Sequence, residues 1–236
     1  MALAAAIYST VGHGGASAYL AIMALFAVSP AIMRPTALAL NLVVAGFAVL
    51  RFGIARQINY RLAAIFAVCA APAAFVGGMV EIPPAYYRPI VGLVLCFAAL
   101  RLLWQPRELA DRPVRPPRLW IAAPAGATLG LLAGLTGTGG GIFLSPLIIL
   151  FGWENPRRTS GIAATFILIN SIAGLAGNIA GVRSLPAELP WFVGAVAIGA
   201  LAGTWLGVER LPRARLLQCL GVVLVIAGAK LLLSNA

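Results

Sequence analysis

The stretch GLTGTGGGIFLSPL, residues 134–147, decides how the rest of the sequence is interpreted. Five of the eight residues from Gly134 to Gly141 are glycine, and apolar sequence lies on both sides of them. A glycine inside a helix costs about 1 kcal/mol relative to alanine. The stretch therefore predicts a break within a segment that otherwise has the composition of a membrane helix.

The composition of the whole chain places that break in a membrane protein. The 236 residues are 61% hydrophobic and only 10% charged, with a mean hydropathy of +0.98. A soluble domain carries about one quarter charged residues. Residues 62–80 and 185–208 are nearly free of charge, and a helix needs roughly 20 apolar residues to cross a bilayer. We therefore expect an all-α integral membrane protein.

The charged residues exclude several functions. The net charge of +11 comes from sixteen arginines and one lysine, which in a membrane protein mark cytoplasmic loops rather than nucleic-acid binding. All six acidic residues fall in predicted loops or near span ends, which argues against a carboxylate proton relay or cation site. Cys69, Cys96 and Cys219 are isolated and no Walker A motif is present. We expect no catalytic residue, metal or cofactor.

The sequence also contains a weak internal repeat, in which three blocks recur in the same order. The matches pair Gly12, Gly14 and Gly15 with Gly137, Gly139 and Gly140; Arg34, Thr36, Ala39 and Gly53 with Arg158, Ser160, Ala163 and Gly177; and Gly78, Pro83, Gly92 and Arg101 with Gly207, Pro212, Gly221 and Lys230. The preserved order predicts two related halves.

Each half is expected to contain a glycine-broken or re-entrant unit followed by three transmembrane helices. The halves are residues 1–104 and 119–236, joined by a linker at residues 105–118 with four prolines and four arginines. The predicted broken units and spans are residues 2–28, 35–53, 61–80 and 84–104 in the first half, and 119–151, 159–181, 188–207 and 212–234 in the second.

The distribution of cations predicts how the halves are oriented. If each broken unit crosses the membrane once, the repeats are parallel and the cations divide 7 to 10 between the two sides. If each unit turns back, the repeats are inverted and the division is 13 to 4, as the positive-inside rule favours. The four cations on the outer side are then Arg34, Arg88, Arg183 and Lys230. We therefore predict inverted repeats, a cytoplasmic linker and both termini outside.

Broken helices at matching positions have a physical use in a membrane. Unpaired backbone groups survive in hydrocarbon only where they line a cavity or are buried in protein. A half-helix that begins at mid-depth presents free N–H groups and a partial positive charge, which bind an anion without any charged side chain. Inverted repeats with paired breaks are the layout of many secondary transporters. The breaks at residues 12–15 and 137–141 fit that layout.

The motifs resemble those of the sulfite exporter TauE/SafE family. They are Gly137-Thr138-Gly139-Gly140-Gly141-Ile142-Phe143-Leu144-Ser145-Pro146, followed by Arg158-Thr159-Ser160-Gly161-Ile162-Ala163, with echoes at Gly12-His13-Gly14-Gly15 and Arg34-Pro35-Thr36-Ala37. Ala16 departs from the pattern, because it stands where the second half has Gly141. The resemblance covers nearly the whole chain and implies a permease for sulfite, thiosulfate, sulfoacetate or related anions.

We expect the substrate to contact polar and glycine residues at and just after the breaks. His13, the single histidine, could bind an oxyanion or carry a proton, or could cap carbonyls of the broken helix. The hydroxyl and amide residues could line a cavity or join helices. The predicted binding residues are Gly12, His13, Gly14, Gly15, Ser17, Thr36, Asn41, Gly137, Thr138, Gly139, Gly140, Gly141, Ser145, Ser160, Thr165 and Asn170.

The favoured function is secondary transport of a small anion, a sulfur oxyanion or organosulfonate, by alternating access in a bacterial-type inner membrane. Protons are candidate coupling ions, and nucleic acid is not a partner. Alternatives are a passive anion channel and a lipid-phosphate flippase, since both would use the same half-helix chemistry; an intramembrane enzyme lacks a residue to orient His13. The sequence leaves the anion, the direction of transport and the oligomeric state open.

Overall fold

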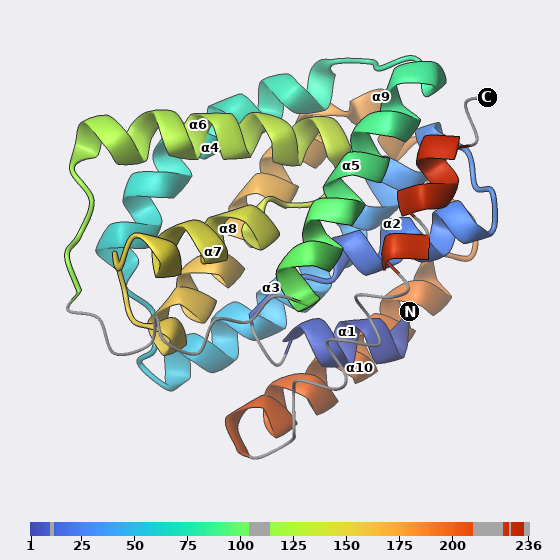
Figure 1. The fold of residues 1–236 in the computed structure, drawn as a ribbon. Coiled ribbons are helices and arrows are strands. Elements are labelled where there is room, and N and C mark those ends of the chain that lie inside the picture. Colours follow the sequence, from blue (N-terminus) through green and yellow to red (C-terminus); the bar gives the residue numbers. More distant parts are fainter. Residues whose placement is uncertain (10–11, 104–113, 210–223, 227, 234–236) are drawn as a thin grey trace.

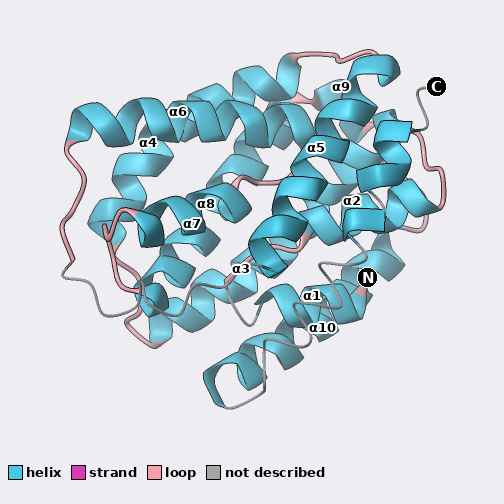
Figure 2. Cartoon of the chain, viewed as in Figure 1, coloured by secondary structure: helices cyan, strands magenta, loops and turns pink. Residues whose placement is uncertain are grey.

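The computed structural model describes residues 1–9, 12–103, 114–209, 224–226 and 228–233. All regular structure in these ranges is helical (Figure 2). The helices are α1 (Ala2–Ser9), α2 (Ala16–Leu25), α3 (Pro30–Ile54), α4 (Tyr60–Met79), α5 (Pro84–Leu103), α6 (Leu119–Thr136), α7 (Gly141–Leu150), α8 (Pro156–Gly177), α9 (Ile179–Val182) and α10 (Leu189–Glu209), with residues 224–226 and 228–233 also helical.

The helices have the lengths that a membrane protein needs. In the described ranges, α3, α4, α6 and α8 are long and apolar enough to cross a bilayer, and α2, α5, α7 and α10 contain shorter apolar stretches. The prediction of an all-helical membrane protein is confirmed. The predicted span at 159–181 is interrupted, because α8 ends at Gly177 and Asn178 caps α9 by accepting a hydrogen bond from the Gly181 N–H at 3.2 Å.

The two glycine-rich stretches do separate helices. α1 ends at Ser9 and α2 begins at Ala16, and α6 ends at Thr136 and α7 begins at Gly141. The 18 residues of α6 extend about 27 Å and the 10 residues of α7 about 15 Å, so α7 is half a span long. In Figure 1, α7 runs back in the direction from which α6 came. The second broken unit therefore turns back on itself.

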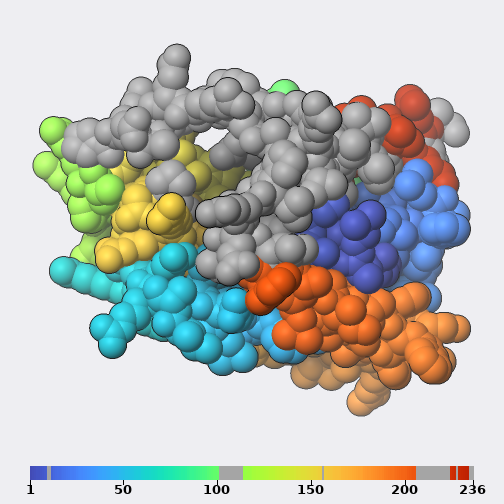
Figure 3. Space-filling view, turned by 90° about the horizontal axis from the view of Figure 1, so that it is seen from below, coloured from blue at the N-terminus to red at the C-terminus, as the bar shows by residue number. Residues whose placement is uncertain are grey.

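Helices of each half pack against helices of the other half. α6 of the second half packs along α4 of the first, while α1 of the first half packs along α10 of the second. Figure 3 shows the second of these pairs, with α1 in dark blue against α10 in orange. In the predicted repeat α1 corresponds to α6 and α4 corresponds to α10, so the two pairs lie at matching positions of that repeat. α3 of the first half also packs against α8 of the second half.

Glycines at four-residue spacing make both pairs close. On α6, a Cβ added at Gly130 or Gly134 would collide with the carbonyl oxygen of Ala70 or Ala74 on α4. On α10, a Cβ at Gly203 would collide with the Ala6 carbonyl of α1. Small residues let helix backbones approach in this way in membranes. The glycine spacing therefore fixes how far apart these helices lie.

Some sequence predictions fall outside the described residues. These are the part of the linker from 105 to 113 and most of the last predicted span, whose residues 212–223, 227 and 234 are not described. The linker residues that follow, from 114 to 118, lead into α6, and the Arg115 N–H donates to the Gly152 carbonyl at 2.8 Å.

Candidate functional site

Asn41 on α3 lies between the two breaks and is fully buried. A Cβ added at Gly14 would collide with Asn41 Oδ1, and one added at Gly139 would lie 2.6 Å from Asn41 Nδ2. Both positions would also lie 3.0 Å from the Ile167 Cγ2 of α8. Asn41 Nδ2 donates to the Thr138 carbonyl at 3.4 Å. The breaks therefore converge on the same two side chains, although 125 residues separate them in the chain.

The backbone of each break has the conformation that frees helix N-termini. Gly15 and Gly140 are the N-caps of α2 and α7, with φ of +89° and +78°, and neither has a side chain to accept from the first-turn N–H groups. Gly12, Gly137 and Gly139 also have positive φ, a region that other L residues adopt only at a cost. Two helix N-termini, each with a partial positive charge, thus begin at the breaks.

Buried polar atoms without hydrogen-bond partners gather around the breaks. Leaving one such atom unpaired costs about 1–3 kcal/mol, so a cluster of them in one region indicates a ligand or water site. Ser171 Oγ is one of them, and it would lie 3.3 Å from a Cβ at Gly139. Within the described residues the unpaired atoms are Tyr19 Oη, Arg34 Nε, Thr36 Oγ1, Asn41 Oδ1, Ser145 Oγ, Asn170 Nδ2, Asn170 Oδ1 and Ser171 Oγ.

Asn170 is fully buried on the face of α8 that meets α6 and α7. One turn before it, Phe166 Cε1 would lie 2.8 Å from a Cβ at Gly140. One turn after it, a Cβ at Gly174 would lie 3.5 Å from the Gly134 Cα. Residues four apart share a helix face, so Asn170 lies on the face of α8 that meets the junction of α6 and α7.

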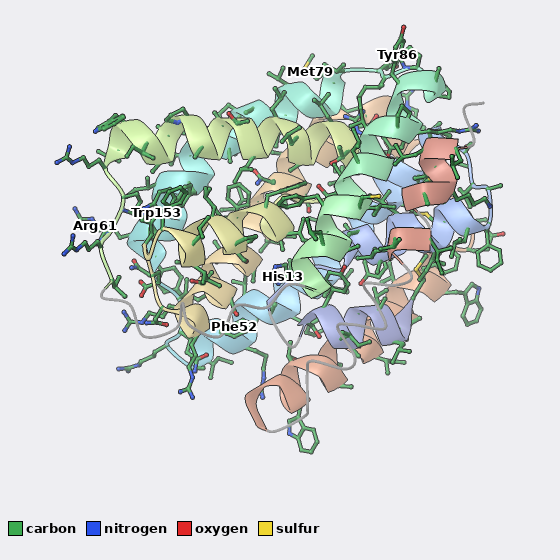
Figure 4. The ribbon with its side chains drawn as sticks, viewed as in Figure 1. His13, Phe52, Arg61, Met79, Tyr86 and Trp153 are labelled. Atoms are coloured by element: carbon green, nitrogen blue, oxygen red, sulfur yellow. The ribbon has the colours of Figure 1, made fainter. Side chains whose placement is uncertain are left out.

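His13 in the first break is half-buried beside Tyr8 of α1. Their ring centroids are 6.4 Å apart at an interplanar angle of 66°, an edge-on contact. The Tyr8 hydroxyl in turn lies 2.7 Å from Ser17 Oγ on α2. The backbone N–H of His13 donates to the Tyr8 carbonyl at 3.0 Å. In Figure 4, Arg61 and Trp153 lie at one end of the bundle, and His13 lies well away from that end. The first break therefore contains a partly exposed histidine beside a buried tyrosine.

The second break has hydroxyl groups in place of a histidine. Thr138 Oγ1 lies 2.9 Å from Thr136 Oγ1, and Thr136 Oγ1 donates to the Leu132 carbonyl at 2.6 Å. Thr138 is therefore the donor in the pair of hydroxyls, which leaves its oxygen as an acceptor only. The Tyr87 hydroxyl of α5 donates to the Thr136 carbonyl at 3.0 Å.

Of the remaining predicted residues, some have features of a binding site and one, Thr165, does not. Thr36 and Ser145 are buried with unpaired hydroxyls. Ser160 lies against Gly12, where its carbonyl oxygen would collide with an added Cβ. The Thr165 hydroxyl donates to the Gly161 carbonyl of its own helix at 3.0 Å, an ordinary helical back-bond, so we remove it from the candidate site. Gly141 begins α7, and a Cβ there would collide with Ile167 Cδ1.

Three polar residues at the site were missed in the sequence. Tyr8, Tyr87 and Ser171 all lie in apolar helices, and all are buried. A polar group inside an apolar span was the available signal for each, and Ser171 directly follows the predicted Asn170. In the described part of the chain, no cluster of three or more His, Cys, Asp or Glu side chains is arranged to hold a metal.

Comparison with known proteins identifies the family of this chain. The sequence profile described as sulfite exporter TauE/SafE matches residues 1–231. The chain belongs to the sulfite exporter TauE/SafE family. A relative in this comparison, the "Probable membrane transporter protein y4hK" of Sinorhizobium fredii (strain NBRC 101917 / NGR234), is 38% identical over 229 residues, which cover 95% of this chain and 92% of the relative. No solved structure matches. This TauE/SafE protein is therefore a membrane transporter with several spans.

Proposed function

We propose that this TauE/SafE protein is a secondary transporter of a small anion, a sulfur oxyanion such as sulfite or an organosulfonate, that binds between the two half-helix ends. The observation that carries the proposal is the contact of Asn41 with Gly14 of one break and Gly139 of the other. An anion at that point would be within reach of both helix N-termini. Alternating access would follow if the two halves rock around it.

The polar groups near the breaks are suited to an anion. Backbone N–H groups at the starts of α2 and α7, the Ser171 hydroxyl and the Asn170 amide are donors, and they carry no net charge that would hold the substrate too tightly. The buried carboxylate of Glu154 is occupied elsewhere: it accepts from Asn59 Nδ2 at 2.7 Å and from the Asn155 N–H at 3.0 Å. The negative charge of Glu154 is thus held by donors of its own neighbourhood.

The orientation of the halves is part of this proposal. The return of α7 along α6 supports units that turn back, and hence inverted repeats with residues 105–118 in the cytoplasm and both termini outside. Single cysteines introduced as Ala110→Cys and Ala236→Cys, in a background where the natural cysteines are alanine, test it with an impermeant thiol reagent. We expect labelling from opposite sides. Labelling of both from one side would refute the inverted arrangement.

Transport is tested in proteoliposomes made with the purified full-length protein. We expect saturable uptake of radiolabelled sulfite or sulfoacetate that depends on an imposed gradient, and a thermal shift of the detergent-solubilised protein by the same anion. Ohmic conductance without saturation would favour the channel. Competition by polyprenyl phosphate, but not by soluble anions, would favour the flippase. Failure of sulfite, thiosulfate, sulfoacetate, sulfate and short carboxylates to bind would overturn the proposal.

A further inference from the structure

A cavity of about 360 Å³ opens at the end of the bundle that carries the C-terminus of α4. Its walls come from the start of α3, the turn between α4 and α5, the start of α5, and the segment around α9. Exposed residues at its rim, among them Ala31, Glu81 and Ser184, open it to the surroundings. We call it the outer cavity, because the cation distribution places this end outside the cell.

Arg34 lines the outer cavity from its inner side. Although it is arginine, only 6% of the residue is exposed. Nη1 donates to the Val80 carbonyl at 2.8 Å, and Nη2 donates to the carbonyls of Gly77 and Gly78 at 2.5 and 2.6 Å. These carbonyls end α4, where the helix dipole is negative. Arg34 therefore holds the last turn of α4 with its guanidinium.

The charge of Arg34 is only partly compensated. Nε is buried and has no hydrogen-bond partner. Within the described residues no carboxylate forms an ion pair with Arg34, and the acidic residue that shares the cavity, Glu81, is exposed at its rim. A buried cation satisfied by carbonyl groups alone retains a positive field, and an anion would stabilise it more than a neutral ligand would.

The outer cavity adjoins the second break. A Cβ added at Gly137 would lie 3.2 Å from both Cα and Cγ of Arg34. Tyr87, which also lines the cavity, donates to the carbonyl of Thr136, the last residue of α6 before the break. An ion that left the cavity on its inner side would meet Arg34 and Tyr87 first and the break next.

We propose that the outer cavity is a binding site for a small oxyanion on its way to or from the breaks, and that Arg34 binds the anion there by exchanging a carbonyl partner for it. This inference rests on the proposed function. It adds a second site, with a real positive charge, to a central site built from dipoles and neutral donors. Glu81 at the rim opposes the anion and sets how strongly the cavity attracts it.

The test measures KM and Vmax for sulfite counterflow in proteoliposomes, together with the melting temperature of each variant. Arg34→Gln should raise KM about tenfold or more, since a charge-assisted contact is lost. Arg34→Lys should recover part of that loss, because it keeps the charge without the planar fork. Glu81→Gln should lower KM about twofold at low ionic strength, an effect that salt screens. The matched controls, Arg158→Gln and Glu188→Gln, change exposed residues that do not line the cavity and should leave KM unchanged.

A purely structural clamp gives a different result. In that case Arg34→Gln lowers the melting temperature with an unchanged KM, and Glu81→Gln has no effect on KM, which overturns the outer site while wild-type counterflow persists. If Arg34→Gln does not fold, Arg34→Lys and Glu81→Gln decide the question in the same way. Absence of sulfite and sulfoacetate counterflow in the wild-type protein would instead overturn the proposed function itself.

Discussion

The break in the first half and the break in the second half begin helices of equal length but have different side chains around them. α2 and α7 each have 10 residues and a glycine N-cap with positive φ. Around the first break lie His13, Tyr8 and Ser17, and around the second lie Thr138 and Thr136. The repeat has kept the backbone geometry and changed the side chains. Under the proposed function, anion binding would depend on the shared backbone, whereas pH response and selectivity would depend on the side chains that differ.

The arginines that follow the breaks differ even more. Arg34 and Arg158 occupy matching positions in the repeat, but Arg34 is buried against the end of α4 while Arg158 is exposed. The neighbours explain the difference. The end of α4 offers three carbonyls to Arg34, whereas Arg158 lies in the first turn of α8, whose N-cap Asn155 accepts from its N–H at 2.9 Å. Among the described residues, therefore, a buried cation lies beside a break at one end of the bundle only.

The largest expected effect comes from substitutions that force apart the helix pairs formed between the halves, α4 with α6 and α1 with α10. Gly130→Ala should destabilise the α4–α6 pair by about 3 kcal/mol, the upper end of overpacking, because its Cβ meets the backbone of Ala70 rather than a movable side chain. Gly203→Ala should destabilise the α1–α10 pair to a similar extent, because its Cβ meets the backbone carbonyl of Ala6. Unfolding in an SDS titration measures both. Gly194→Ala, where no atom lies within 4 Å, is the control, and an equal loss there would contradict the argument.

Asn41 and Thr165 are paired in the repeat, but only Asn41 touches both breaks. Asn41→Ala should therefore reduce sulfite uptake about tenfold or more, because one group is removed from both half-helix ends. Thr165→Ala should keep uptake near the wild-type level, since its hydroxyl already bonds to the Gly161 carbonyl. Uptake in proteoliposomes at equal protein content compares them. Equal losses in the two variants would count against a site centred on Asn41.

The two glycines that contact the Asn41 side chain, Gly14 and Gly139, differ in backbone conformation. Gly139 has φ of +73°, and Gly14 does not have positive φ. Gly139→Ala should thus lower the free energy of unfolding by about 1 kcal/mol more than Gly14→Ala, because alanine is strained in the left-handed region. Both changes press on the Asn41 side chain, so both should slow uptake. A larger loss of stability in Gly14→Ala would show that side-chain crowding outweighs backbone strain.

The smallest expected effect concerns the side chains that differ between the breaks. His13→Gln should reduce uptake about threefold and flatten its dependence on pH, because glutamine donates hydrogen bonds but does not take up a proton near neutral pH. Thr138→Val should keep both uptake and its pH dependence near those of the wild-type protein, because the Thr138 hydroxyl already donates to Thr136 and has no hydrogen left for an anion. Initial rates between pH 6 and pH 8 separate the two. An unchanged pH profile in His13→Gln would remove His13 from proton coupling.

Composition and local pattern were enough to predict part of this structure. Apolar length predicted the helical membrane class, and glycine clusters located both breaks. These features depend on neighbours in the sequence. The choice of Asn41 over Thr165, and the roles of Tyr87 and Ser171, depend on which helices meet, and a single sequence holds no direct record of contacts between residues about 100 positions apart.

The packing of α1, in the first half, against α10, in the second half, has a consequence for biosynthesis. α1 (Ala2–Ser9) packs along α10, which begins only at Leu189. While the ribosome is still producing the chain, the first break therefore lacks the surface that later covers α1. The proposed anion site should assemble only after the second half has inserted. A chain released after residue 118 should therefore be recognised by quality-control proteases rather than transport anything.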